Sequence, residues 1–136
     1  MPMLKLPRLR RALPAAALLL GLAAAGCAVQ SSAPGPGFLV FYTPFSANLD
    51  ADASRIVGDA AKAALAEPSR QVYVLGYADS LGSTQANGTL TRLRAQVVRD
   101  ALVAAGIPAS RITLQPKGAQ GGDPGVESRR VEIELR

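Results

Sequence analysis

The chain has 136 residues, with 15 Lys and Arg against 10 Asp and Glu, a formal net charge of +5 and an isoelectric point near 10.0. Four of the basic residues lie in the first 11 positions, so residues 27–136 are close to neutral. The charge therefore gives no argument for nucleic-acid binding. The chain has no His and one Cys, and nothing in it resembles a P-loop or a metal-ligand cluster. We therefore predict that it is not an enzyme and has no catalytic residues, metal or cofactor.

Residues 1–26 have the pattern of an export signal. The four basic residues precede an apolar run from Ala12 to Ala25, whose 14 residues are too few to span a bilayer. The run ends in LAAAGC, which resembles a lipobox, where bacterial lipoproteins are cut and the new N-terminal Cys is acylated. We therefore predict a lipoprotein signal peptide over 1–26 and a lipid anchor, with palmitate among its acyl chains, on Cys27.

Two details bear on the fate of Cys27. The lipobox pattern prefers Leu three residues before the Cys, and Ala24 stands there instead, so ordinary secretory cleavage beside Ala25 is an alternative. A buried free thiol or an intermolecular disulfide would also account for a lone exported cysteine. Ala28 follows the Cys in place of Asp, which in the lipoprotein pattern implies the outer membrane. The expected location is this membrane, with the domain facing the periplasm.

Residues 28–37 read AVQSSAPGPG and have no periodicity. With Cys27 they predict a tether over 27–37, which reaches at most about 30 Å when extended. One domain is expected over residues 38–136.

The apolar periodicity predicts two helices and four strands in this domain. Phe38–Tyr42 is an apolar run typical of a buried strand. Val131, Ile133 and Leu135 alternate with acidic residues, which is typical of a strand with one solvent-exposed face. The remaining elements are a helix over Asp50–Glu67, a strand over Gln71–Tyr77, a helix from about Gln85 to Ala105 and a strand over Arg111–Gln115. The order β-α-β-α-β-β predicts a two-layer α+β domain with the helices on one face of a mixed sheet.

The second helix carries an arginine on its apolar side. At about 100° per residue, one face holds Arg92, Gln96 and Arg99, and the opposite stripe holds Leu90, Val97, Ala101 and Ala105. Arg94 lies inside that stripe. A buried guanidinium must find a carboxylate or several acceptors, because an unpaired buried charge costs several kcal/mol. We therefore predict that an anion meets Arg94.

The stretch Gly76–Leu102 carries an ordered motif. Its elements in this sequence are Gly76, Tyr77, Asp79, Gly82, Asn87, Leu90, Arg94 and Ala95. This pattern resembles the core motif of the OmpA-like peptidoglycan-binding family, G-(H/Y)-T-D-x-x-G-x-x-x-x-N-x-x-L-S-x-x-R-A. The resemblance extends back to Ser46 and Leu49 and forward to the closing RRVEIEL, and covers most of residues 38–136. It implies the same fold as the periodicity does.

The resemblance also implies a ligand, the diaminopimelate of the peptidoglycan stem peptide. In the family the motif Asp and Arg grip this residue, and here they are Asp79 and Arg94. An aspartate can accept from the ammonium group, and a guanidinium can take a carboxylate bidentately. The alternative is an internal salt bridge between Asp79 and Arg94 that merely satisfies the buried arginine.

The resemblance implies further ligand contacts around this pair. Asn87 either orients the loop or is a plain helix N-cap. Arg129 is either a secondary ligand contact or an arginine that is solvated or lies at the edge of the sheet. Gly76 is expected to serve backbone geometry. The full predicted ligand-binding set is Asp79, Leu81, Gly82, Ser83, Asn87, Arg94 and Arg129.

Three departures from the family pattern fall near the expected site: Ala78 replaces Thr, Ser128 replaces Asn, and the loop over 118–127 is short. They are expected to weaken or alter binding. The predicted function is nevertheless a non-catalytic lipoprotein that tethers the outer membrane to peptidoglycan. The alternative is a protein–protein interaction module of the cell envelope that uses a degenerate form of the same fold.

Overall fold

The computed structural model describes residues 37–119 and 125–136. The predicted signal peptide, Cys27 and nearly all of the tether lie outside the described residues, as does the middle of the 118–127 loop. The elements are β1 (Phe38–Phe41), α1 (Ala51–Ala66), β2 (Val72–Ala78), α2 (Thr84–Ala104), β3 (Ile112–Ala119) and β4 (Arg130–Leu135). Short 3-10 turns, Ala109–Arg111 and Val126–Ser128, precede β3 and β4.

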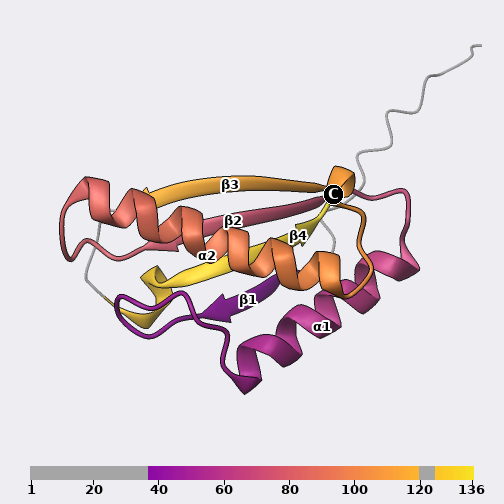
Figure 1. Ribbon diagram of the computed structural model, residues 1–136, viewed down its shortest axis with the longest axis horizontal. Helices are drawn as coiled ribbons and strands as arrows, with labels where there is room; N and C mark the ends of the chain where they lie inside the picture. Colours follow the sequence, from indigo (N-terminus) through magenta and orange to yellow (C-terminus); the bar gives the residue numbers. More distant parts are fainter. Residues whose placement is uncertain (1–36, 120–124) are drawn as a thin grey trace, which may run out of the picture. The chain divides into compact units, whose positions relative to one another are not determined.

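The four strands form one mixed sheet in the order β1-β4-β2-β3. β4 pairs antiparallel with both β1 and β2, whereas β2 and β3 run parallel. Both helices pack on the same face of this sheet, with α2 lying mainly against β3 and β2 and α1 lying beside β1 (Figure 1). The predicted two-layer α+β architecture is therefore confirmed. Within the described ranges, no helix is long and apolar enough to cross a membrane.

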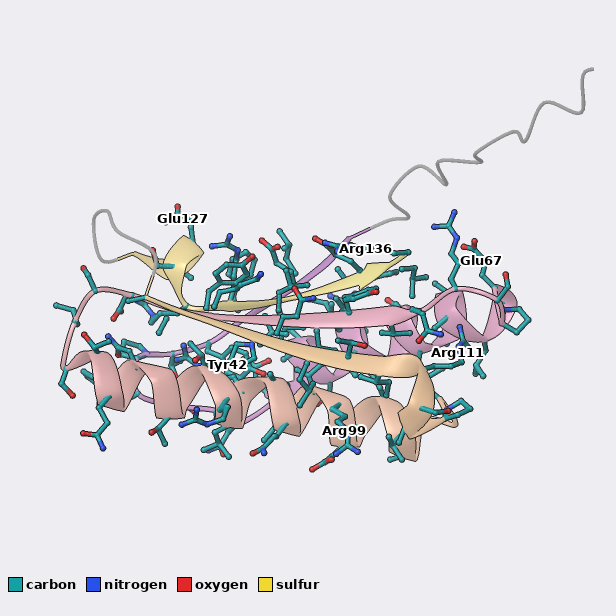
Figure 2. All side chains as sticks on the ribbon, turned by 90° about the horizontal axis from the view of Figure 1, so that it is seen from above. Tyr42, Glu67, Arg99, Arg111, Glu127 and Arg136 are labelled. Carbon is teal, nitrogen blue, oxygen red and sulfur yellow. The ribbon has the colours of Figure 1, made fainter. Side chains whose placement is uncertain are left out.

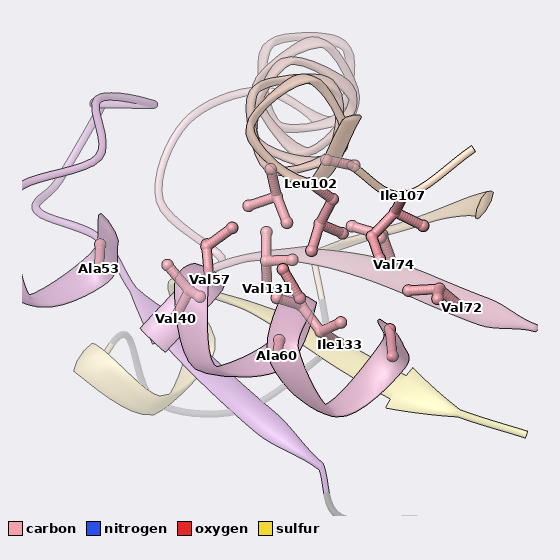
Figure 3. Close-up of a cluster of buried hydrophobic side chains, with 14 of the residues drawn as sticks. Val40, Ala53, Val57, Ala60, Val72, Val74, Leu102, Ile107, Val131 and Ile133 are labelled. Atoms are coloured by element: carbon pink, nitrogen blue, oxygen red, sulfur yellow. The ribbon is translucent and has the colours of Figure 1, made fainter. Parts of the chain in front are cut away.

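The core lies between the helices and the sheet (Figure 3). α1 contributes mostly small side chains to it, including Ala53, Ala60 and Ala64. The helix begins as predicted, because the Asp50 side chain accepts a hydrogen bond from the Ala53 N–H at 2.8 Å. The alternation predicted for the last strand is also confirmed: Val131, Ile133 and Leu135 are fully buried.

Both edge strands differ from their predictions. β1 was predicted to be a buried strand, but among the described strands it pairs only with β4, and Leu39 and Phe41 are 44% and 41% exposed. Its apolar run did not distinguish an edge strand from a central one. β3 continues past the predicted end at Gln115 to Ala119, with Pro116 inside it. Within residues 37–119 and 125–136, β3 pairs only with β2, so Pro116 does not interrupt a described ladder on its other side.

The buried stripe of α2 is rotated relative to the prediction. Ala105 is exposed, and Leu90, Val97 and Ala101 are only partly buried. The residues buried instead are Asn87, Thr91, Arg94, Ala95, Val98 and Leu102. The reason lies in β2, where a Cβ on Gly76 would come within 2.5 Å of the Thr91 carbonyl oxygen. Gly76 thus serves backbone geometry as predicted, because its missing side chain lets α2 approach β2 along the Thr91 side.

Candidate ligand-binding site

The loop between β2 and α2 is held by its own polar side chains. Asp79 is 6% exposed, and its Oδ1 accepts from the Leu81 N–H at 3.1 Å. Ser83 caps α2 by accepting from the Ala86 N–H at 3.1 Å. Gly82 has a φ of 90°, a region that favours glycine. The chain therefore leaves the sheet at Asp79 and enters the helix at Ser83 in a defined conformation.

Asn87 fixes this loop from the first turns of α2. It is 5% exposed, and its Nδ2 donates to the Asp79 carbonyl oxygen at 3.0 Å. The alternative that Asn87 is a plain N-cap is wrong, because Ser83 occupies that position. The observed contact fits the other expectation, that Asn87 orients the loop.

Asp79 forms an ion pair with Arg129, which lies just before β4. Arg129 Nη1 is 3.2 Å from Asp79 Oδ2, and the side chains are 17% and 8% exposed. Arg129 Nε also donates to the Tyr42 carbonyl oxygen at 3.3 Å. The alternative that Arg129 is a solvated arginine is wrong. The fold brings together two charges that are 50 residues apart in the sequence.

Arg94 is fully buried, and its hydrogen bonds go to main-chain carbonyls. Nε donates to Ser46 at 2.8 Å, Nη1 to Tyr77 at 3.2 Å and Nη2 to Thr43 at 3.2 Å. The guanidinium also lies over the Tyr42 ring, 4.8 Å from its centroid. The structure thus supplies the several acceptors that a buried arginine needs.

Within the described part of the chain, carbonyl oxygens are the hydrogen-bond partners of the Arg94 guanidinium. The ligand carboxylate that was predicted to meet Arg94 stays a prediction. The alternative, an internal salt bridge between Arg94 and Asp79, is wrong, since the ion pair of Asp79 is with Arg129. The helical pattern identified a buried charge but could not name its acceptors, which lie 17, 48 and 51 residues earlier.

Burial dominates the electrostatics of this region. It lowers the pKa of Arg94, an effect that the nearby Tyr42 and Asp79 oppose and the Arg129 charge reinforces. The guanidinium nevertheless remains charged, because arginine is not deprotonated in proteins. Burial also raises the pKa of Tyr42, which lies between α2 and the sheet (Figure 2). Arg94 and Arg129 therefore place two positive charges around Asp79.

A turn over Thr43–Ser46 brings one more side chain to the site. The Ser46 N–H donates to the Thr43 carbonyl oxygen at 3.3 Å, and Pro44 and Phe45 occupy the middle positions. Phe45 has a φ of 57° and is 76% exposed. Proline followed by a residue of positive φ is typical of a type II turn, whose third position usually holds Gly. Sequence reasoning missed Phe45, and Pro44 was the only signal for the turn.

An open groove of about 490 Å³ lies over this loop and the start of α2. It is lined by Phe45, Leu81, Gly82, Ser83, Gln85, Ala86, Asn87, Thr89, Leu90 and Leu93. Four of the predicted site residues, Leu81, Gly82, Ser83 and Asn87, are thus in its wall. Asp79, Arg94 and Arg129 are not lining residues, but Asp79 contacts both Leu81 and Asn87. Apolar side chains such as Phe45, Leu81 and Leu93 thus line the groove, and the Asp79–Arg129 ion pair lies next to it.

The fold and this loop define an OmpA-like domain. The OmpA family model matches residues 41–130, and the chain belongs to this family. Outer membrane protein A of Shimwellia blattae is 40% identical over 81 residues, which cover 48% of this chain. The probable lipoprotein YiaD of Escherichia coli (strain K12) is 37% identical over 75 residues, or 50% of this chain. Each match spans only 34% of the length of the relative.

Solved structures share the fold. The crystal structure of the peptidoglycan-associated lipoprotein from Burkholderia pseudomallei matches with a TM-score of 0.67 at 21% sequence identity. The match covers 72% of this chain and 89% of that chain. The arrangement of two helices on a mixed four-stranded sheet is therefore the OmpA-like fold.

Proposed function

We propose that this chain is a non-catalytic cell-wall-binding lipoprotein that tethers the outer membrane to peptidoglycan by gripping diaminopimelate of the stem peptide. Membership of the OmpA family supports this function, as do similarities to an outer membrane protein, a probable lipoprotein and a peptidoglycan-associated lipoprotein. The predicted signal peptide and Cys27 anchor complete the proposal. The domain then faces the periplasm from the outer membrane.

The observation that carries the proposal is the ion pair between Asp79 and Arg129. A ligand that carries an ammonium and a carboxylate can replace both partners at once. Asp79 then accepts from the ammonium while an arginine takes the carboxylate, and neither buried charge is left uncompensated. Diaminopimelate has these groups, so an exchange of ion pairs is a physical route to its recognition.

Other residues of the loop support the same ligand. Asn87 fixes the main chain at Asp79, and the Leu81 N–H donates to the Asp79 carboxylate. The backbone amides of Gly82 and Ser83 lie just before the first turn of α2, where the helix dipole favours anions. Charge-assisted hydrogen bonds contribute about 1.5–3 kcal/mol each. Two such contacts correspond to dissociation constants from tens of micromolar to several millimolar, on the order expected for one repeat of a polymer.

Sedimentation with purified sacculi tests the proposal. The chain without its signal peptide is expected to pellet with sacculi, and Asp79→Ala is expected to abolish pelleting while the circular dichroism spectrum is retained. Asp59→Ala is the matched control, because Asp59 is a half-exposed carboxylate on α1 whose ion pairs are at the surface. Normal pelleting of the Asp79 variant would refute the ligand assignment. It would favour the alternative function, a docking module for an envelope protein.

A further inference from the structure

The proposed site and the point where the chain enters the domain lie at opposite ends of the sheet. The chain passes from Gly37 into β1, which begins beside Ile133, near the end of β4. The far end of β1 reaches the site, because the Tyr42 N–H donates to the Arg129 carbonyl oxygen at 2.8 Å. Asp79 lies at that same end, in its ion pair with Arg129. A pull between the tether and the site therefore runs along the strands (Figure 1).

This pull passes through the pairing of β1 with β4. Under the proposed function the tether loads the start of β1, and the ligand loads the chain at Asp79 and Arg129, just after β2 and just before β4. β1 is antiparallel to β4 and pairs with no other strand among the described residues. The loaded ends of these two strands are therefore at opposite ends of their ladder. Tension then drives β1 to slide along β4, and it does not peel the strands apart from one end.

The ladder resists sliding better than peeling. Hydrogen bonds between antiparallel strands are perpendicular to the strands, so sliding stretches all of them together, whereas peeling breaks them one at a time. All four residues of β1 are paired with β4, and the hydrogen bond between Tyr42 and Arg129 extends the ladder by one position. A short edge strand thus shares the load over its whole length.

The side chains of β1 add a second resistance to sliding. Val40 is fully buried in the core and Tyr42 is 4% exposed, whereas Leu39 and Phe41 alternate with them and are exposed. Successive side chains of a strand point to opposite faces, so a slip by one residue would exchange the buried and the exposed set. β1 must therefore lose its core contacts before it can settle in a new register.

We infer that the domain is a load-bearing link, in which the β1–β4 ladder carries tension between the membrane and the cell wall in the sliding direction. This inference rests on the proposed function, which supplies the two points of loading. It adds a mechanical function to that of binding. Tension releases the ligand before it unfolds the domain, so the domain stays folded and able to bind again.

Single-molecule force measurements test the inference with two arrangements of attachment points. The chain without its signal peptide keeps Cys27, its only cysteine, as one attachment point on the tether side. Glu127→Cys supplies the second point at an exposed position three residues before β4, which loads the ladder in the sliding direction. Arg136→Cys, just after the end of β4, loads the same two strands from one end and is the matched control.

The domain is expected to unfold at a force at least about twice as high with Glu127→Cys as with Arg136→Cys, because forced unfolding depends on the unfolding rate along the direction of loading. Both variants should unfold at the same urea concentration, since they differ in the direction of the load and not in the fold. Leu81→Cys, an exposed position in the loop after β2, loads the sheet from the site by a second route and should also give the higher force.

Equal forces in the two arrangements, or a higher force with Arg136→Cys, would overturn the load-bearing role. The force measurement uses no ligand, so it separates this inference from the proposed function. Equal forces in a chain that pellets with sacculi would overturn the load-bearing role alone. A chain that does not pellet but unfolds at unequal forces would overturn the proposed function and leave the mechanical difference between the two directions in place.

Discussion

At the scale of single residues, the site depends on how closely α2 approaches β2. Gly76 and Thr91 set that distance, because the Thr91 carbonyl oxygen occupies the space beside the Gly76 Cα. Arg94 follows Thr91 by one helical turn and Asn87 precedes it by one. The hydrogen bonds of both side chains to β2 and its loop therefore need the same close approach.

Gly76→Ala should destabilise the domain by about 1–3 kcal/mol, because its methyl group forces the helix away from the strand. Urea unfolding measures the change. Gly58→Ala is the matched control: nothing lies within 4 Å of a Cβ there, in the interior of α1. That substitution should raise stability by about 0.5–1 kcal/mol. Changes of the same sign in both variants would contradict the packing argument.

At the scale of the elements, α1 is terminated by a residue from elsewhere in the chain. The helix has no basic side chain in its last turn. Arg111, from the turn before β3, instead donates to the carbonyl oxygens of Ala64, Glu67 and Arg70 at 2.7–3.0 Å. A cation at this end also complements the helix dipole. The contact connects α1 to the start of β3.

Arg111→Ala should lower the free energy of unfolding by about 2–3 kcal/mol, because it leaves carbonyls unpaired at the end of a helix. Arg99→Ala removes a surface ion pair with Asp100 at 3.7 Å and should cost no more than about 0.5 kcal/mol. Thermal or urea unfolding of the two variants gives the comparison. Equal effects would mean that Arg111 does not cap α1.

The elements show how far the sequence could predict this molecule. Helix bounds and the alternation of Val131, Ile133 and Leu135 follow from local periodicity, and the predictions were close. The partners of Arg94 and Arg111 were not predictable in the same way, because their acceptors lie 17–51 residues away. Periodicity shows that a charge is buried but not which carbonyls meet it. The exposed side chains of β1 were missed for the same reason, since strand order is a tertiary property.

At the scale of the whole molecule, the proposed affinity of one site for peptidoglycan is low. Stable attachment therefore also requires a high local concentration of the domain beside the cell wall. The proposed site adjoins an open groove of about 490 Å³. A polymer that repeats the same ligand raises the chance of rebinding if the domain is kept beside it. An acyl chain on Cys27 would supply this effect, since it confines the domain to the surface that faces the mesh.

The 136-residue chain, expressed in a bacterium that processes lipoproteins, is therefore expected to incorporate labelled palmitate and to fractionate with the outer membrane. Cys27→Ser should lose the label and release the protein into the periplasmic fraction. It should also reduce recovery with sacculi after crosslinking in cells, although the purified domain binds sacculi as before. The reason is that the substitution changes local concentration and leaves the site in the domain intact.

Retention of the palmitate label in Cys27→Ser would contradict the anchor. Loss of the label with unchanged crosslinking would show that the site holds the wall without confinement.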